Sequence, residues 1–344
     1  MSLLHRRHLI AAALGWPLLR KANAAEAPAA ITVATAGASA ARPRDVLETP
    51  ALLSPLAPRQ LLNGLALAGR RVVAVGQRGH VLLSDDAGAR WRQAPVPVSS
   101  DLVAVHFADA RLGWAVGHDG VLLHSADGGE TWQRQHDGRS AGPQGTETPL
   151  LDVCFRDGRS GYAIGAFGLM LRTDDGGAHW TPAPEAIDNP KNLHLYALRS
   201  AGDTLLAVGE QGLALKLDAA AQRWRALQLP YGGTLFGLLA AGRSVLAFGL
   251  RGTVLRSTDG GQQWQTIPTG LSVGLTAGTV LADGRIVLAS QAGHLIASRD
   301  EGASFAPLVT TGDRPLPAAA LIEAAPGTLV LAGPRGVQSL PLRS

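Results

Sequence analysis

The chain has 344 residues, with 31 Lys and Arg against 27 Asp and Glu, 42 glycines, 21 prolines and one cysteine. A lone cysteine excludes an intramolecular disulfide, and so much Gly and Pro is typical of a turn-rich sheet protein. Residues 1–24 hold four basic residues and no acid, so the remaining chain carries 27 of each and is formally neutral. Net charge therefore gives no support for a nucleic-acid partner.

The first 24 residues resemble an export signal. Arg6 and Arg7 precede an Ala- and Leu-rich stretch, and Ala22-Asn-Ala24 is an A-x-A cleavage pattern. The paired arginines favour a twin-arginine signal, with a general secretory signal as the alternative. Residues 25–43 are predicted to be a flexible linker, and no later stretch is apolar enough to span a bilayer. We expect an exported, periplasmic protein, or one held at a membrane by its partner.

A short motif, Gly-x-x-Gly followed by an apolar strand, recurs seven times after residue 44. The copies are Gly76/Gly79, Gly117/Gly120, Gly165/Gly168, Gly209/Gly212, Gly249/Gly252, the variant Ser290/Gly293, and Gly333/Gly336. Their spacing of 40–48 residues, with several short strands in each unit, is typical of β-propeller blades. Residues 44–344 are therefore predicted to form an all-β, seven-bladed propeller with four-stranded antiparallel blades.

The seventh unit offers three strands, at residues 318–324, 328–332 and 337–342. An unpaired edge strand is a liability for aggregation. We expect residues 44–52 to supply the fourth strand of this last blade. Cys154 lies within an inner strand of the third unit and is predicted to be a buried, unreactive thiol.

A second motif, Ser/Thr-x-Asp-x-Gly-x-x-Trp, is known as the Asp box and follows four of the Gly-x-x-Gly strands. Its defining residues are Ser84, Asp86, Gly88 and Trp91; Ser125, Asp127, Gly129 and Trp132; Thr173, Asp175, Gly177 and Trp180; and Ser257, Asp259, Gly261 and Trp264. Two further copies are degenerate, since residues 217–224 keep only the Trp and residues 298–305 replace it by Phe305. The Asp carboxylate is suited to accept hydrogen bonds from backbone N–H groups across a tight turn. The Trp side chain is suited to bury its apolar ring beneath that turn.

The boxes predict structural turns between the third and fourth strands of each blade. A calcium loop needs six or more oxygen ligands, whereas each box offers one or two carboxylates. No metal or cofactor is therefore predicted. The Gly-x-x-Gly turns would join the second and third strands on the opposite face, together with the connections between blades.

That opposite face is where we expect function, because binding residues favour loops on a rigid scaffold. Three Gly-x-x-Gly turns carry an arginine at the third position, namely Arg78, Arg251 and Arg335. Guanidinium groups suit a carboxylate-bearing peptide or protein surface, although solvated turn residues are the plain alternative. Tyr231 and Glu210 are further candidates on this face. The long connections at residues 134–149 and 182–194 are predicted to aid recognition.

The boxes, the Gly-x-x-Gly strands and the export signal together resemble the photosynthesis system II assembly/stability factor family of cyanobacteria and plastids, which has relatives in non-photosynthetic bacteria. The resemblance covers the chain from about residue 44 to its end. It implies a seven-bladed propeller that binds a membrane protein during assembly through an arginine-rich patch, for which Arg78, Arg251 and Arg335 are the matching positions. The interpretation is a non-enzymatic, monomeric assembly, stability or accessory factor. Its partner would be a membrane protein or envelope complex, in photosystem assembly or elsewhere.

Asp boxes also occur in sialidases, so a sialidase-like glycoside hydrolase is the alternative function. That chemistry needs three clustered arginines, a Tyr nucleophile paired with a Glu, and an acid. The available tyrosines are Tyr162, expected to pack within a sheet, Tyr196, expected to face the channel, and Tyr231. Glu210 and Asp119 are the candidate acids.

Overall fold

The computed structural model describes residues 45–142, 145–183, 185–309 and 315–342. The predicted export signal (residues 1–24) and linker (residues 25–43) lie outside this part of the chain. Both therefore stay predictions.

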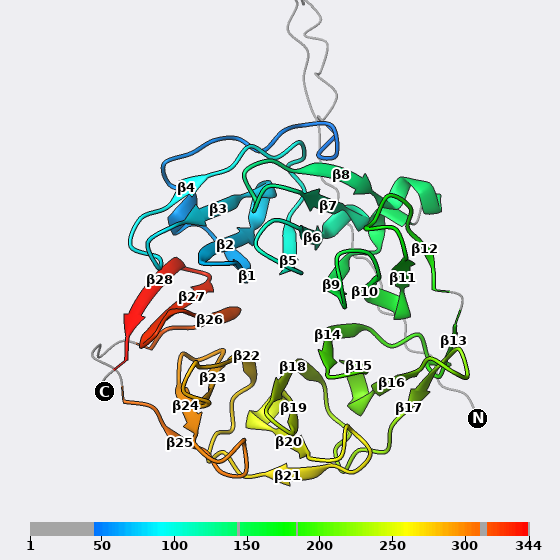
Figure 1. The fold of residues 1–344 in the computed structure, drawn as a ribbon, viewed down its shortest axis with the longest axis vertical. Coiled ribbons are helices and arrows are strands. Elements are labelled where there is room, and N and C mark those ends of the chain that lie inside the picture. The colour runs from blue at the N-terminus through cyan, green and yellow to red at the C-terminus, as the bar shows by residue number, and fades with distance from the viewer. Residues whose placement is uncertain (1–44, 143–144, 184, 310–314, 343–344) are drawn as a thin grey trace, which may run out of the picture. The chain divides into compact units, whose positions relative to one another are not determined.

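Seven sheets surround a central channel, which confirms the seven-bladed propeller (Figure 1). Blades one to three consist of β1 (Leu62–Ala68), β2 (Arg71–Gly76), β3 (Val81–Ser84) and β4 (Arg92–Gln93); β5 (Leu102–Phe107), β6 (Gly113–Gly117), β7 (Leu122–Ser125) and β8 (Gln133–His136); and β9 (Leu150–Phe155), β10 (Gly161–Gly165), β11 (Met170–Thr173) and β12 (Thr181–Pro182). Within each blade the strands follow chain order from the channel outward, and neighbours are antiparallel.

Blades four to seven repeat this order. They consist of β14 (Leu195–Ala201), β15 (Thr204–Gly209), β16 (Ala214–Asp218) and β17 (Arg223–Ala226); β18 (Leu235–Ala241), β19 (Ser244–Gly249), β20 (Val254–Ser257) and β21 (Gln265–Ile267); β22 (Leu275–Val280), β23 (Ile286–Ser290), β24 (Leu295–Ser298) and β25 (Ala306–Pro307); and β26 (Ala320–Ala325), β27 (Thr328–Gly333) and β28 (Gly336–Pro341). Blade four gains an outer fifth strand, β13 (Ala186–Ile187), which pairs with β17 in parallel.

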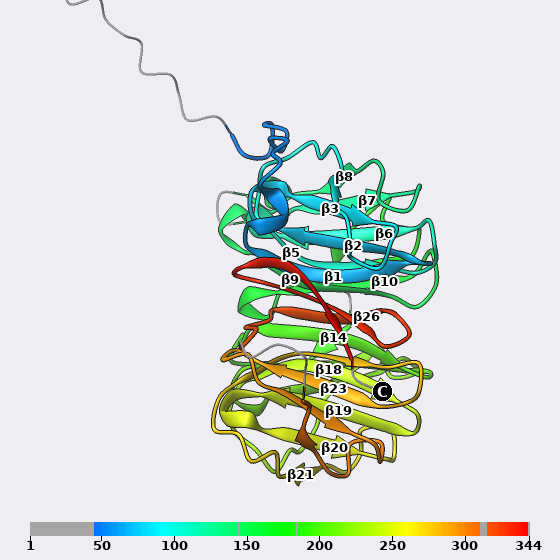
Figure 2. The same ribbon diagram turned by 90° about the vertical axis from the view of Figure 1, so that its left-hand side faces the viewer.

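The helical segments of the described residues are short 3-10 turns. They are η1 (Ala57–Arg59), η2 (Gln77–Gly79), η3 (His118–Gly120), η4 (Gly138–Ala141), η5 (Gly145–Glu147), η6 (Ala166–Gly168), η7 (Glu210–Gly212) and η8 (Leu250–Gly252). Five of them, η2, η3, η6, η7 and η8, are Gly-x-x-Gly turns. In Figure 2 the coils that mark these short turns lie along one side of the disc, its left-hand side.

Apolar packing between neighbouring blades holds the ring together. Each junction has its own cluster of buried side chains, and the cluster that joins blades seven and one contains Leu62, Leu82 and Ala332. The second strand of a blade lies between its two neighbours in the sheet and is covered on both faces by adjacent blades. This explains why β6 and β19 are buried along their whole length and read as continuous apolar runs.

Each Asp box closes its turn with its own hydrogen bonds. In blade two the Ser125 hydroxyl donates to Asp127 Oδ1 at 2.8 Å and accepts the Gly129 N–H at 2.8 Å. The Asp127 carboxylate also accepts the N–H of Thr131 at 3.0 Å, and the Trp132 indole donates to the Gly129 carbonyl at 2.9 Å. The Asp is therefore directed at its own backbone.

The other boxes repeat this pattern, except that the Trp180 indole donates to the Gln135 side chain at 3.4 Å. The degenerate copy at residues 298–305 also forms the turn, since Ser298 Oγ donates to Asp300 at 2.7 Å and accepts the Gly302 N–H at 2.8 Å. Phe305 only replaces the indole. The Trp224 of the other degenerate copy is fully buried. The turn thus depends on the Ser/Thr, Asp and Gly positions, whereas the aromatic position depends on packing.

The predicted closing strand is wrong for the described residues 45–52. Blade seven has three strands, and this segment instead forms a turn in which the Asp45 carbonyl accepts the Glu48 N–H at 3.0 Å. Leu47 is buried between blades one and two, and the Ala51 N–H bonds to the Val96 carbonyl at 3.0 Å. The segment lies there because the Leu47 side chain is buried in the apolar cluster between these blades. The ring closes through the apolar cluster at the junction of blades seven and one.

Acid is expected to weaken the boxes in a defined pH range. Hydrogen bonds lower the pKa of Asp300 to about 2, from 3.8 in an unfolded chain. Because the folded pKa is the lower one, this stabilisation is complete above about pH 4 and is lost as the pH falls through about 2. Asp300→Asn should therefore be less stable than the wild type at pH 5, with the difference vanishing near pH 2 in urea melts.

A control for this prediction is Asp203→Asn, because the Asp203 carboxylate forms no hydrogen bond with a described residue. That variant should follow the wild-type acid profile. A stability difference between Asp300→Asn and wild type that persisted unchanged down to pH 2 would contradict a role for the ionised carboxylate.

Candidate binding face and central channel

The Gly-x-x-Gly turns present their third residue to solvent. Arg78, Phe167, Gln211 and Arg251 have left-handed backbone conformations, with φ of 55°, 54°, 52° and 57°. All four are exposed. This conformation directs the side chain away from the blade, while the following glycine packs inward.

Those glycines place the turns beside the connections between blades. A Cβ on Gly79, Gly212 or Gly252 would lie 2.2 Å from a carbonyl oxygen of the adjoining connection, at Val98, Tyr231 and Leu271 respectively. No side chain fits in such a gap. The turns and the connections therefore share one face, here called the Gly-turn face, and the boxes and the hairpins between first and second strands form the opposite, Asp-box face.

Arg78, Arg251 and Arg335 lie at the Gly-turn face on blades one, five and seven. All three are exposed, and none forms an ion pair with any residue that the structure describes. Blades seven and one are neighbours in the ring, and blade five is two further round, as the sequence predicts. Three cationic groups are thus available on this face for an anionic or carboxylate-bearing partner.

Tyr231 and Glu210 lie on the same face, but their polar groups are engaged. The Tyr231 hydroxyl donates to the Leu250 carbonyl at 3.1 Å, which brings its ring beside the Arg251 turn. Glu210 Oε2 accepts the N–H of His194 at 2.9 Å. Tyr231 can therefore present its ring to a partner, whereas Glu210 mainly orders the entry into β14.

A row of aromatic rings crosses this face and was not identified from the sequence. Phe167 contacts His194 edge-on at 4.8 Å between ring centroids, His194 is 6.3 Å from Tyr196, and Tyr196 contacts Phe236 at 5.7 Å. The row leads from the exposed Phe167 turn to Tyr196 and Phe236, which line the channel. The available signal was Phe167 itself, an aromatic residue at a turn position that other blades fill with Arg, Asp, Gln or Ala.

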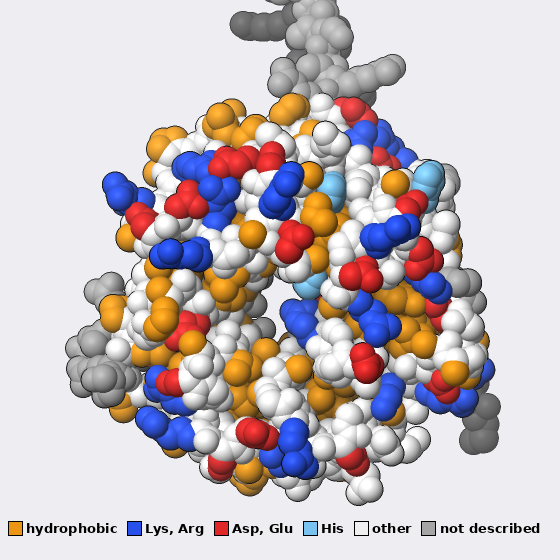
Figure 3. All heavy atoms as spheres, in the orientation of Figure 1, with side chains coloured by type: hydrophobic (Ala, Val, Ile, Leu, Met, Phe, Trp, Pro, Cys, Tyr) orange, Lys and Arg blue, Asp and Glu red, His pale blue; other side chains and the backbone are white. Residues whose placement is uncertain are grey.

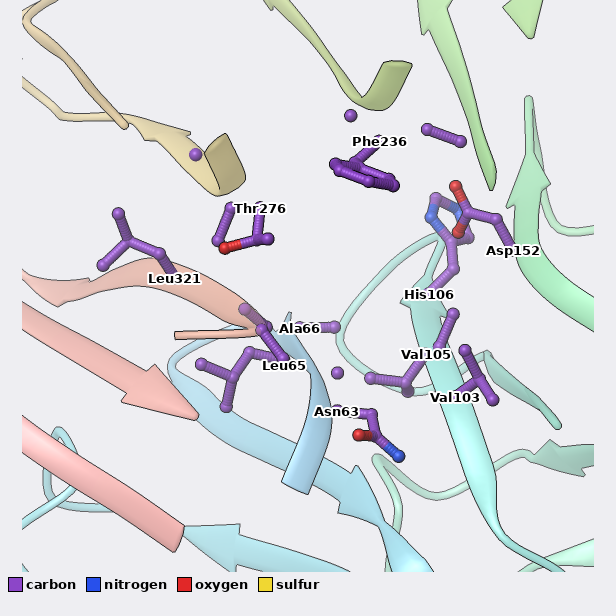
Figure 4. Close-up of a pocket in the computed structure, with 18 of the residues that line it drawn as sticks. Asn63, Leu65, Ala66, Val103, Val105, His106, Asp152, Phe236, Thr276 and Leu321 are labelled. Atoms are coloured by element: carbon purple, nitrogen blue, oxygen red, sulfur yellow. The ribbon is translucent and has the colours of Figure 1, made fainter. Parts of the chain in front are cut away.

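The channel is a cavity of about 830 Å³ lined by the innermost strands of all seven blades. Figure 4 shows His106 and Asp152 on adjacent strands at one wall, with Phe236 and Thr276 of other blades pointing into the same space. Figure 3 shows the channel open at the centre of one face, with acidic and basic side chains interspersed around it. The lumen thus combines apolar and polar side chains, and one of its walls is polar.

That polar wall is a charge pair between neighbouring blades. Asp152 is buried, and one of its oxygens accepts the Leu198 N–H at 2.8 Å and an Arg199 N–H. Burial raises the pKa of Asp152, and the charge of Arg199 opposes that rise. The Arg199 side chain is 46% exposed because it faces the channel lumen. Nearby, burial and the Arg199 charge lower the pKa of His106 to about 4, so its imidazole is neutral at pH 7.

The structure places two of the tyrosines that were weighed as a sialidase nucleophile. Tyr162 is buried in its sheet as predicted, and its hydroxyl donates to Glu185 at 2.7 Å. Tyr196 faces the channel as predicted, but burial and the charge of Glu210 raise its pKa, which disfavours the phenolate. The Gly-x-x-Gly arginines project from three different blades. Among the described residues no group of three His, Cys, Asp or Glu could hold a metal ion.

The two long connections, which are predicted to aid recognition, also make contacts within the propeller. In residues 134–149, Arg139 donates to Glu48 at 2.8 Å and to Asp137 at 2.7 Å, which ties down the N-terminal segment. In residues 182–194, β13 widens blade four.

Cys154 is a buried free thiol whose pKa is raised by burial. No helix of the described residues is long and apolar enough to cross a bilayer.

Known structures share this architecture at low sequence identity. A structure described as YCF48 bound to D1 peptide is 18% identical, with a TM-score of 0.68, and the match covers 85% of this chain and 96% of that one. YCF48 from Cyanidioschyzon merolae is 16% identical, with a TM-score of 0.62 and coverage of 85% and 98%. A GH74 enzyme of Niastella koreensis is 13% identical, with a TM-score of 0.63 and coverage of 81% and 52%. These likenesses support the propeller fold.

No curated protein matches the chain. The family model of the photosynthesis system II assembly factor YCF48 matches residues 68–142 and 143–305, which is well over half of the sequence. The match runs through the Gly-x-x-Gly turns and Asp boxes of blades one to six. The chain therefore belongs to the photosynthesis system II assembly factor YCF48 family.

Proposed function

We propose that this protein is exported and acts, without catalysis, by binding a protein partner during the assembly or stabilisation of a membrane-protein complex. The observation that carries the proposal is the set of three exposed arginines on the Gly-turn face that form no ion pair with any residue the structure describes. Family membership supports it, as does the related propeller that is described as bound to a peptide. The complex is photosystem II or, in a non-photosynthetic host, another assembly of the cell envelope.

The partner would contact two kinds of group on this face. Arg78, Arg251 and Arg335 offer charge-assisted hydrogen bonds to carboxylates, and the aromatic row from Phe167 to Phe236 offers apolar and edge-on contacts. Aromatic and arginine side chains carry much of the binding free energy in protein interfaces. An extended acidic peptide segment fits this combination.

Replacing Arg78, Arg251 and Arg335 by alanine should reduce partner recovery from host membranes at least about tenfold, since each charge-assisted bond contributes roughly 1 kcal/mol or more. The measurement is proximity labelling or affinity capture in the native host, followed by quantitative mass spectrometry. Thermal stability should change little, because all three side chains are exposed.

The matched control is the alanine substitution of Arg70, Arg243 and Arg299. These arginines are likewise exposed and without an ion pair to a described residue, but they lie on the Asp-box face. This control removes the same charge and should leave recovery at the wild-type level. Equal loss of partner recovery in both triple variants would show that only the net charge matters. No loss of recovery in either variant would show that the Gly-turn arginines are not part of the binding site.

A further inference from the structure

Three leucines protrude from the N-terminal segment on the Gly-turn face. Leu52, Leu53 and Leu56 are 78%, 63% and 54% exposed, which makes them among the most exposed large apolar side chains of the described residues. We call them the leucine patch. Most exposed apolar residues occur singly and need no explanation, but three within five residues of one segment do.

The fold fixes the backbone segment that carries these three leucines. Buried Ala51 and Ala57 anchor the segment at both ends. Between them the side-chain amide of Gln93 donates to the Leu52 carbonyl at 3.1 Å and accepts the Ser54 N–H at 2.9 Å. The segment is therefore fixed with its small residues inward and its leucines outward.

Basic residues surround the leucine patch. A Cβ on Gly336 would lie 1.9 Å from the Pro58 carbonyl, so the segment passes directly over the turn that carries Arg335. Arg59 of the segment is exposed, and Ala51 packs at Gly79, next to Arg78. None of these three arginines forms an ion pair with a described residue.

Two nearby acids are already paired with other arginines. Glu48 is held by Arg134 and Arg139, and Asp45 lies 3.5 Å from Arg139. Asp101 lies beside the Arg78 turn, where its carboxylate accepts the backbone N–H of Arg78 at 2.7 Å. The leucine patch is therefore framed by three arginines, Arg59, Arg78 and Arg335, against one nearby acid that no described arginine pairs with.

We propose that the leucine patch and these arginines form a docking surface for an anionic phospholipid bilayer. Leucine side chains that protrude from a surface can each insert into the lipid interface, and arginine side chains bind phosphate headgroups. A protein partner would instead favour aromatic anchors and a pocket. None of the three leucines lines the channel cavity, whereas the aromatic row on the far blades leads into it. The Gly-turn face thus has a lipid-facing region around the leucine patch, which shares Arg78 and Arg335 with the proposed partner site, and an aromatic row that leads into the channel.

The test places an environment-sensitive fluorophore on the patch of the full chain through Leu53→Cys. Cys154 is buried, so the label reacts with the introduced thiol. Vesicles of phosphatidylglycerol and phosphatidylcholine should shift the emission to the blue and raise its intensity roughly twofold or more, whereas pure phosphatidylcholine should not. About 1 M salt should reverse the change, because the screening length falls to about 3 Å.

Two controls separate the patch from general membrane binding. The label at Leu67→Cys, a 39% exposed position near the opposite end of β1, should not respond. Arg59→Glu with Arg335→Glu should abolish the Leu53→Cys response, and Arg70→Glu with Arg243→Glu on the Asp-box face should not. A label on the patch that ignores anionic vesicles, or responds only when host membrane proteins are added, would overturn the proposal. Because no partner protein is present, this result is independent of the proposed function.

Discussion

Replacing Trp114 by alanine is expected to lower the free energy of unfolding by about 3–5 kcal/mol. Trp114 is fully buried on β6 of blade two. It stacks on Phe155 of blade three, with ring centroids 3.5 Å apart, and its indole N–H donates to the Gly176 carbonyl at 3.2 Å. Its loss would open a cavity at a junction between blades and remove one of the two hydrogen bonds that the Gly176 carbonyl accepts, the other coming from Gln135. The melting temperature should fall by roughly 5–15 °C in calorimetry.

Two further variants test this explanation. Trp114→Phe keeps a ring on Phe155 and should recover part of the loss. Trp91→Ala removes a box tryptophan that is only partly buried, so it should cost less, about 1–2 kcal/mol. If Trp114→Ala and Trp91→Ala melted at the same temperature, burial between blades would not be what makes Trp114 important.

The second large effect is expected for Arg199→Ala, which should cost about 2–3 kcal/mol because it leaves the buried Asp152 carboxylate without its charge partner. The figure lies below that of a fully buried pair, since Arg199 is about half exposed to channel water. The variant's stability should also depend on pH. Without Arg199 the pKa of Asp152 rises further above its unfolded value, so the folded state binds more protons and the loss shrinks as the pH falls from 7 towards 4.

Asp152→Asn in the Arg199→Ala background tests the cause. A neutral amide removes the buried charge, so this double variant should regain stability at pH 7 and lose the pH dependence. Arg199→Lys keeps a positive charge and should be close to wild type. A deficit for Arg199→Ala that stayed constant between pH 7 and 4 would show that packing, and not the charge of Asp152, is responsible.

Local features were predictable because their causes lie within one repeat. The spacing of the Gly-x-x-Gly motif predicted seven blades in chain order, and within each blade the strands pair with their neighbours in sequence, apart from β13, which joins β17. The box turns close through hydrogen bonds between residues two to four apart, such as Ser125, Asp127 and Gly129. The shared face of Arg78, Arg251 and Arg335 follows from the alternation of turns along an antiparallel blade.

Contacts between blades were decided only by the tertiary structure. Asp152 meets Arg199 across 47 residues, and Phe236 joins the aromatic row that begins at Phe167 on blade three. Residues 45–52 were expected at blade seven but pack at blades one and two, where Leu47 is buried. A local pattern shows that a side chain needs burial or a partner, but the ring's geometry determines which distant residue meets that need. The sequence by itself thus determined the blades and their turns, and the closed ring decided the channel, the aromatic row and the position of the N-terminal segment.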